Sequence, residues 1–233
     1  MKHIVMTPMN AYLYTKNSAE DADKWFKHRM ELFKEYNVPS IKSQTCRDFT
    51  WLVYIDELTP SEHIQMIDKA CECCKDVYEI VVGEWGNKSV TIDWLKLDGV
   101  PDWLITTRFD NDDCMKSTLV ETVQNFFNEH QRNEVINFRV NYKIDHRNGF
   151  GRRWEAAAPN SFISLIEPIA DINKIKLVNS DSHSNAKALA KVFNVETTPM
   201  FGMVVHGMNK VNKMNRVKGD PVTIENIKKE FWG

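Results

Sequence analysis

Three aspartates within four residues form the part of this sequence best suited to chemistry. Asp110, Asp112 and Asp113 directly follow the apolar run Leu104–Phe109 and precede a helical pattern. Carboxylates this close repel one another, and each resists ionisation unless a cation lies nearby. Mg²⁺ or Mn²⁺ commonly takes one or two carboxylates together with phosphate oxygens and waters. The spacing therefore predicts a divalent-cation site for a phosphorylated ligand, whereas the alternative is a set of acids that interact with a helix N-terminus.

The elements that must position this cluster alternate between strand and helix patterns. The order strand–helix–strand–helix–strand in the first half predicts an α/β fold with a mixed, mainly parallel sheet flanked by helices on both faces. Ligands of such sheets sit beyond the carboxyl ends of the strands, so Asp56, directly after one strand, is also of interest. We expect strands at His3–Met6, Thr50–Ile55, Tyr78–Val82, Leu104–Phe109, Ile136–Val140, Phe162–Leu165 and Met203–Val205. We expect helices at Ala19–Glu35, Pro60–Lys75, Thr91–Leu97, Met115–His130, Asn185–Phe193 and Thr223–Phe231.

Length and composition indicate one globular domain over residues 1–233. Hydrophobic residues make up 42% and charged residues 27% of the chain, which is ordinary for a protein with a packed core. The net charge of −2 argues against a nucleic-acid binder by bulk charge. The five cysteines, the missing secretory signal and the missing membrane-span pattern predict reduced thiols and a cytoplasmic protein. The cluster Cys71, Cys73 and Cys74 has no second Cys/His pair at zinc-finger spacing.

Two segments are locally basic. One runs from Arg132 to Arg153 and the other from Gly207 to Gly219, which holds four basic residues and no acid. Both would suit a phosphorylated ligand, and both would also suit solvated loops. We expect the basic C-terminal segment, about residues 207–233, to act as a lid over the ligand.

The residues around the aspartates resemble a known family. The run Thr106–Asp113 is similar to the Arg-x-Asp-Asn-Asp-Asp core of the putative rhamnosyltransferase family, a set of GT-A-type nucleotide-sugar glycosyltransferases. The resemblance covers about residues 25 to 209 as an ordered series of blocks. These blocks are Trp25-x-x-x-Arg29-x-x-x-Phe33, Pro39-Ser40, Gln44-Thr45, Phe49-x-Trp51-Leu52-Val53, Asp56, Asn160–Glu167 and the His-Gly-x-Asn motif His206-Gly207-Met208-Asn209.

The resemblance implies a GT-A-like fold and roles for the acids. Asp56 would contact the nucleoside of the donor, and Asp110 would touch ribose or metal. Asp112 would hold the metal, and Asp113 would support the metal or the sugar. His206 would be a late metal ligand or a diphosphate contact, and neutral imidazole is a suitable ligand for Mn²⁺.

The expected reaction defines further candidates. Bond cleavage leaves negative charge on a nucleoside diphosphate, which a bound metal and nearby basic side chains can neutralise. Donor contacts are expected from Arg29, Arg108, Arg152, Arg153 and Asn209. The acceptor hydroxyl needs a base if the reaction inverts, for which Glu167 is the first candidate and Asp145 the second, with Asp113 also in the catalytic group.

The sequence thus predicts a metal-dependent glycosyltransferase that uses Mn²⁺ or Mg²⁺ and a UDP-, GDP- or dTDP-linked sugar. The acceptor is either a glycan or a hydroxymethylated base in phage DNA, beside which Trp154 could stack. The alternatives are a nucleotidyltransferase acting on a sugar phosphate and a non-catalytic polyanion-binding module. No Gly-x-Gly-x-x-Gly, P-loop or Gly-x-Ser-x-Gly motif occurs, which argues against dinucleotide enzymes, P-loop NTPases and α/β hydrolases.

Overall fold

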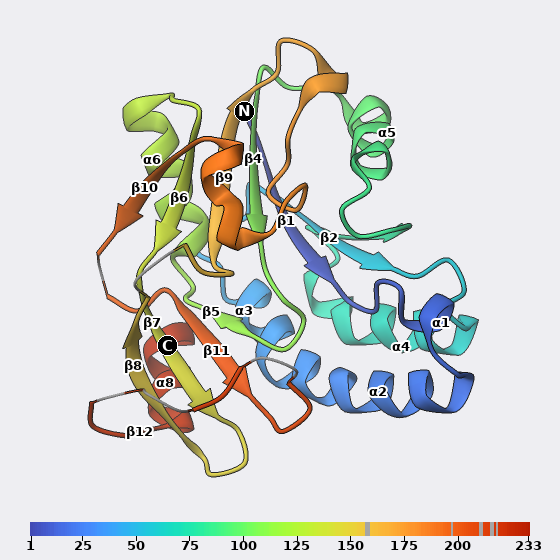
Figure 1. Cartoon of the computed structure of the whole chain (residues 1–233), viewed down its shortest axis with the longest axis vertical. Coiled ribbons are helices and arrows are strands. Elements are labelled where there is room, and N and C mark those ends of the chain that lie inside the picture. Colours follow the sequence, from blue (N-terminus) through green and yellow to red (C-terminus); the bar gives the residue numbers. More distant parts are fainter. Residues whose placement is uncertain (157–158, 197, 210–211, 215–216, 218) are drawn as a thin grey trace.

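The chain forms two β-sheets that meet at the aspartate cluster, as the computed structural model shows (Figure 1). It describes residues 1–156, 159–196, 198–209, 212–214, 217 and 219–233. The larger sheet contains β1 (Lys2–Pro8), β2 (Thr50–Ile55), β3 (Tyr78–Val82), β4 (Trp103–Arg108), β6 (Glu134–Phe138), β9 (Ile163–Pro168) and β10 (Lys191–Val195). The smaller sheet contains β5 (Cys114–Met115), β7 (Val140–Asp145), β8 (Phe150–Glu155), β11 (Phe201–Val205) and β12 (Val222–Thr223).

The larger sheet is mixed and mainly parallel. Its strand order is β10-β6-β9-β4-β1-β2-β3, and only β9 runs antiparallel to its described neighbours. The inner strand β1 is buried on both faces, because Val5 joins one hydrophobic cluster while Ile4 and Met6 join another. Such a strand needs helices on both sides of the sheet.

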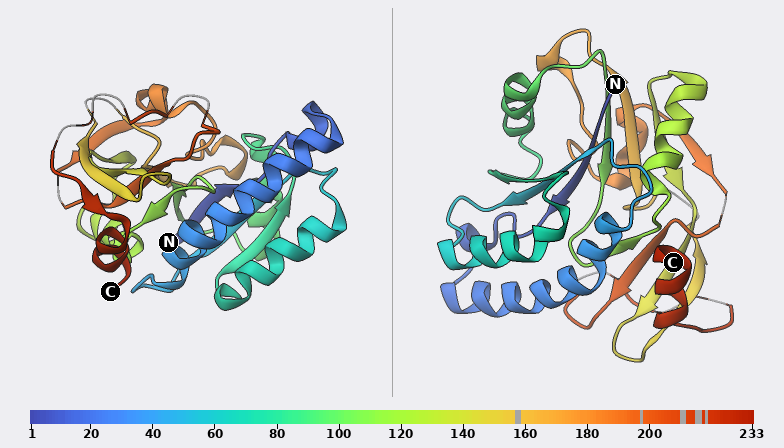
Figure 2. Two further views of the ribbon diagram at one scale, coloured as in Figure 1. Left: turned by 90° about the horizontal axis from the view of Figure 1, so that it is seen from below. Right: turned by 180° about the vertical axis from the view of Figure 1, so that it is seen from behind.

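Helices cover both faces of the larger sheet, as the composition of its strands requires (Figure 2). One face packs against α2, α4 and α6, and the other against α5 and α7. The predicted fold class is confirmed. The helices are α1 (Leu13–Lys16), α2 (Ala19–Leu32), the π-helical turn η1 (Phe33–Asn37), α3 (Val38–Lys42), α4 (Ser61–Cys71), α5 (Lys88–Asp98), α6 (Leu119–His130), α7 (Ala186–Leu189) and α8 (Ile224–Trp232), together with the 3₁₀ turns η2 (Glu72–Cys74), η3 (Ile172–Lys174) and η4 (His183–Asn185).

The smaller sheet has the order β12-β8-β7-β11-β5 and packs on α8. The buried residues Ile224, Ile227 and Phe231 lie on the face of α8 that meets the sheet. This packing corrects part of the predicted lid, since residues 224–232 form a core helix. Of the remaining lid residues, 210, 211, 215, 216 and 218 lie outside the described part of the chain.

Two predicted elements differ from the structure. The expected helix Asn185–Phe193 ends at Leu189, since Ala190 is fully extended and Lys191–Val195 pairs with β6. Here the gain of a paired edge strand outweighs local helix propensity. The expected strand Ile136–Val140 belongs to two strands in different sheets, β6 and β7. None of the helices in the described part of the chain combines the length and apolar character needed to cross a bilayer.

Candidate active site at the aspartate cluster

Asp110 lies just beyond the carboxyl end of β4, where its backbone and side chain are both fixed. Arg108 grips the carboxylate with two parallel hydrogen bonds, from Nε to Oδ1 at 3.0 Å and from Nη2 to Oδ2 at 3.1 Å. The Asn37 amide, from the π-helical turn after α2, donates to the Asp110 carbonyl at 2.8 Å. A bidentate guanidinium contact has a fixed geometry, so the Asp110 carboxylate is held in one orientation.

Asp112 is buried, with 7% of its surface exposed, and is charged. His206 Nε2 lies 2.9 Å from its Oδ2, and Arg29 Nη1 contacts the same oxygen. Burial alone would raise the pKa of Asp112, but the hydrogen bond from His206 and the Arg29 charge together lower it below its ordinary value. Asp112 is therefore an anion in the cluster, held by one residue from α2 and one that follows β11.

A second histidine extends this contact. His28 Nε2, on α2, lies 2.8 Å from His206 Nδ1. Either ring can donate in the contact between the two histidines, because the roles depend on the tautomers. Burial, followed by the His206 and Arg29 charges, lowers the pKa of His28. Asn209, the expected donor contact, instead caps the turn, because its Oδ1 accepts from His206 N at 2.6 Å.

Asp113 forms a hydrogen bond with the smaller sheet. It is 3% exposed, and its Oδ1 accepts from the backbone N–H of Val204, on β11, at 2.8 Å. Burial, together with the charges of Asp112 and Asp110, raises its pKa well above the ordinary value. Asp113 therefore joins the cluster to the smaller sheet, and its expected support of the metal or the sugar stays a prediction.

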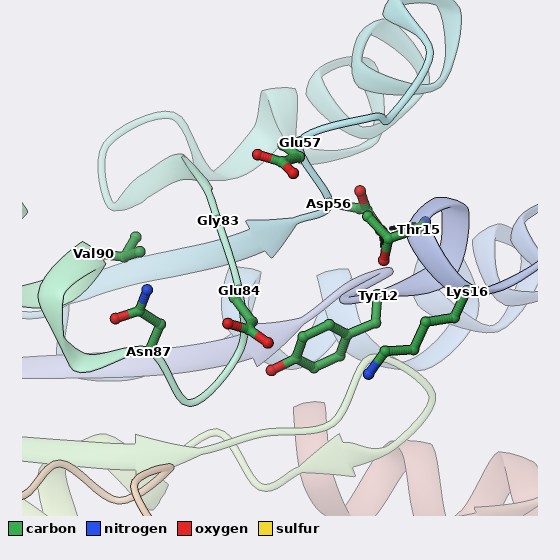
Figure 3. Close-up of a pocket in the computed structure, with 9 residues that line it drawn as sticks. All are labelled: Tyr12, Thr15, Lys16, Asp56, Glu57, Gly83, Glu84, Asn87 and Val90. Carbon is green, nitrogen blue, oxygen red and sulfur yellow. Dashed lines mark hydrogen bonds between the residues drawn. The ribbon is translucent and has the colours of Figure 1, made fainter.

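A first cavity of about 540 Å³ opens beyond β1, β2 and β3 (Figure 3). We call it the Tyr12 cavity. Its three carboxylates suit hydroxyl and N–H donors rather than phosphate. Burial, with a hydrogen bond to Glu84, raises the pKa of Tyr12 to about 12, so the phenol is neutral. The lining residues are Tyr12, Thr15, Lys16, Asp56, Glu57, Gly83, Glu84, Asn87 and Val90.

Asp56 lines this cavity, but its carboxylate already accepts several hydrogen bonds. Its Oδ2 accepts from the backbone N–H groups of Tyr14 and Thr15 at 3.1 and 3.2 Å, and its Oδ1 accepts from Leu58 N at 2.9 Å. Asp56 therefore holds α1 against the end of β2. These contacts fix the part of the cavity wall that lies beside Asp56.

A second cavity, of about 320 Å³, is lined by Asp110 and Asp112, and we call it the aspartate cavity. Tyr12 also lines the first cavity, so the two adjoin. Its lining combines two arginines and two aspartates with the aromatic rings of Tyr12, Trp25 and Trp85. The lining residues are Pro8, Met9, Ala11, Tyr12, Trp25, Arg29, Trp85, Arg108, Asp110, Asn111 and Asp112.

A third cavity, of about 560 Å³, lies on the other side of Asp110, and we call it the Trp154 cavity. Arg108 and Asp110 border both this cavity and the aspartate cavity. It reaches the smaller sheet. The lining residues are Arg108, Asp110, Lys143, Trp154, Ala156, Pro159, Asn160, Ser161, His183, Met203 and Asn212.

A family model described as "Putative rhamnosyl transferase" matches residues 8–220. The chain belongs to this family. No curated protein matches the sequence.

Solved structures show the same GT-A fold as this family member. S. aureus TarS has a TM-score of 0.53 and 13% identity, over 88% of this chain and 37% of that one. Residues 1–349 of TarS in complex with UDP give a TM-score of 0.52 and 14% identity, over 88% and 61%. The mannosyltransferase PcManGT from Pyrobaculum calidifontis, in complex with GDP-Man and Mn²⁺, gives 0.50 and 11%, over 90% and 58%. The chain therefore spans less than two thirds of each of these proteins.

Several residues predicted for the candidate site lie elsewhere. Glu167 is on β9, which runs antiparallel to β4, and it pairs with Leu104 at the strand start whereas Asp110 follows the strand end. Its oxygens accept from the backbone N–H groups of Lys176 and Leu177 at 2.8 and 2.9 Å. This position corrects the expected base role, because Glu167 anchors a loop near the start of β4, at the opposite ends of the strands from Asp110.

The other predicted residues from the smaller sheet also separate. Asp145 binds Asn148 through both oxygens at the β7–β8 turn, and this turn role replaces the expected base role. Arg153 pairs with Tyr142 on the sheet face that meets α8, so it is turned away from all three cavities. Arg152 lies on the opposite face and donates to the Gly219 carbonyl, so the structure gives it no contact with the aspartate cavity.

The site also contains residues that the sequence did not single out. Tyr12 follows β1, and Glu84 and Trp85 follow β3, so all three obey the rule that ligand sites form beyond strand ends. Applying that rule to every strand would have found them. His28 carried no such signal, because its partner His206 is 178 positions away in the chain.

Proposed function

We propose that this protein is a glycosyltransferase that moves a sugar from a nucleotide donor to an acceptor hydroxyl. One observation carries the proposal: Asp110 and Arg108 form the common border of the aspartate cavity and the Trp154 cavity. A donor in the first cavity and an acceptor in the second would meet at that border. Membership of the rhamnosyl transferase family supports the same reaction.

The charges of the cavities support the placement of a nucleotide donor. The Tyr12 cavity is acidic and offers acceptors for the hydroxyl and N–H groups of a nucleoside. The aspartate cavity offers Arg29 and Arg108 for a diphosphate. Structurally similar proteins hold UDP or GDP-Man, and we include dTDP among the candidate nucleotides because the fold does not select the base.

The residues present fit a divalent cation that shares its coordination with a diphosphate. Asp110 and Asp112 line one cavity, Asp110 is held there by Arg108, and the pKa of Asp112 is lowered. In the described part of the chain, no set of three or more His, Cys, Asp and Glu side chains could hold a metal by itself. One or two carboxylates suffice for Mg²⁺ or Mn²⁺ when phosphate and water complete the shell. Such a cation would neutralise charge on the departing diphosphate, and His206 would orient Asp112 for it.

The side chains of the protein supply the remaining steps. Arg29 and Arg108 stabilise the negative charge that develops on the leaving group, an effect often worth ~3–4 kcal/mol per donor. Trp25, Trp85 and Tyr12 wall the aspartate cavity and restrict water beside the sugar. Asp110 is the carboxylate that borders the acceptor side in the described residues, so it is positioned to interact with the incoming hydroxyl.

Binding and turnover together test the proposal. Full-length protein is titrated with UDP, GDP and dTDP, with Mn²⁺, with Mg²⁺ and with EDTA, and release of nucleotide from matching sugar donors is measured. We expect one nucleotide to bind, and EDTA to abolish slow donor hydrolysis. If pyrophosphate is released from a nucleoside triphosphate instead, the protein is a nucleotidyltransferase. If no nucleotide binds and DNA binding survives Asp112→Ala, a polyanion-binding module is correct.

A further inference from the structure

We propose that the acceptor carries an anionic group, a phosphate or a carboxylate, and that Lys143 in the Trp154 cavity binds it. The inference rests on the proposed glycosyl transfer and adds the chemical class of the second substrate. It starts from a cation that the cavity contains and that the protein leaves without an acidic partner.

Lys143 is a half-buried lysine whose charge no described carboxylate neutralises. It lines the Trp154 cavity from β7, and its one recorded interaction places Nζ 5.2 Å from the centre of the Trp154 ring. Burial lowers the pKa of Lys143, with no opposing contribution from a carboxylate. A partly desolvated cation without a counter-charge is costly, and a bound anion would remove that cost.

A second positive charge stands directly across the strand pair. Lys143 on β7 is in register with Arg152 on β8, so their side chains share one face of the sheet. Like charges at directly opposite positions destabilise a sheet. The described polar partner of Arg152 is the backbone carbonyl of Gly219, which is not an acid. The pair therefore concentrates positive potential beside the cavity.

Two acids of this region, Asp110 and Asp145, are hydrogen-bonded to other residues. Asp110 is bound by both nitrogens of the Arg108 fork, and Asp145, two residues from Lys143 on the same strand, is bound by Asn148. The residues outside the described part of the chain include no Asp or Glu in the sequence. The positive charge is therefore available to a ligand.

The size of this charge favours a small anionic acceptor over DNA. Proteins that bind a duplex typically neutralise about 6–10 phosphates. Among the described residues of this region, Arg139 is paired with Glu155 and Glu196 and the lining Arg108 is paired with Asp110, which leaves Lys143 and Arg152 as cations without an acidic partner. Two charges and one aromatic ring, Trp154, match a sugar or polyol with a single anionic substituent, since a sugar ring can lie on the indole.

Three methyl glucosides that differ only at carbon 6 test the inference. One carries CH₂OH, one a phosphate ester and one a carboxylate, and each is titrated into the full chain with and without the nucleotide that binds it. We expect the phosphate or the carboxylate to bind at least about tenfold more tightly than the neutral sugar, the effect of one charge-assisted hydrogen bond. The two anionic arms identify which group is preferred.

Variants assign the effect to Lys143. Lys143→Met should abolish the preference and Lys143→Arg should retain most of it, with unchanged nucleotide affinity in both. Lys69→Met, which removes the same charge from an exposed position on α4, is the matched control. Equal binding of the three sugars, or binding of none, overturns the inference even when the nucleotide binds normally. Tighter, salt-dependent binding of a duplex containing hydroxymethylcytosine also overturns it in favour of DNA.

Discussion

The substitution Glu167→Gln tests whether Glu167 stabilises the fold or acts as the catalytic base. The side chain is 5% exposed, and its two oxygens accept from Leu177 N at 2.9 Å and Lys176 N at 2.8 Å. Gln keeps the shape but replaces one acceptor with an NH₂ group. One backbone N–H then faces another donor in a buried place.

The size of the effect follows from that single lost acceptor. Leaving a buried backbone donor unsatisfied costs about 1–3 kcal/mol. In a domain of 150–250 residues, 1 kcal/mol lowers Tm by roughly 2–4 °C, so we expect Glu167→Gln to melt roughly 2–12 °C below the wild type. The rate of sugar transfer at a temperature where both proteins are folded should change less than about twofold, because Asp110 lies beyond the other end of β4.

Thermal melts and urea titrations, paired with turnover of the donor, measure both quantities. The control is Glu129→Gln, which changes an exposed glutamate on α6 and should alter neither. The reasoning would be refuted if Glu167→Gln kept the wild-type Tm while its transfer rate fell a hundredfold. That result would restore Glu167 as the catalytic base.

Three further substitutions probe the cluster and its support. Asp112→Asn removes the charge that faces Arg29, and we expect nucleotide release to slow by roughly 100–1000-fold; a rate near wild type would remove Asp112 from the reaction. Asp113→Asn keeps an acceptor for Val204 N but removes a carboxyl group whose pKa is raised in the folded protein. The wild type therefore loses stability as the pH rises above about 3.9, the pKa of an aspartate in the unfolded chain, whereas the variant does not. The Tm difference in favour of Asp113→Asn should therefore grow between pH 4 and 7 in melting curves, and a constant difference would contradict the raised pKa. Gly202→Ala would place a Cβ 2.7 Å from Ile144 Cδ1, and overpacking should cost about 1–3 kcal/mol in urea unfolding, with no loss as the contrary result.

Sequence reasoning succeeded where the signal was local. The apolar runs at β1, β2 and β4 have no competing helical pattern, and each is a buried strand of the larger sheet. The aspartates were found because their spacing is chemically unusual, and Asp110 and Asp112 do share a cavity. The family relationship was also confirmed.

It failed where tertiary pairing decides. Lys191–Val195 becomes a strand because β6 offers a parallel edge, a fact absent from the local pattern. Glu167 looked like a site residue because it lies near the end of an apolar strand. That strand, β9, runs antiparallel to β4, so its end lies beside the start of β4 and far from Asp110. Strand direction is a property of the whole fold. The cytoplasmic location, the metal and the donor nucleotide stay predictions.

The position of β5 has a consequence for any attempt to shorten this protein. Directly after Asp113 the chain enters the smaller sheet at Cys114–Met115, where β11 pairs with it and Trp232 Nε1 donates to the Met115 carbonyl at 3.1 Å. The acidic loop is therefore anchored by Trp232 of α8. The final turn of α8 lines none of the three cavities, but its deletion would remove the Trp232 hydrogen bond and should loosen the aspartate loop. We therefore expect a fragment that ends before α8 to lose nucleotide affinity.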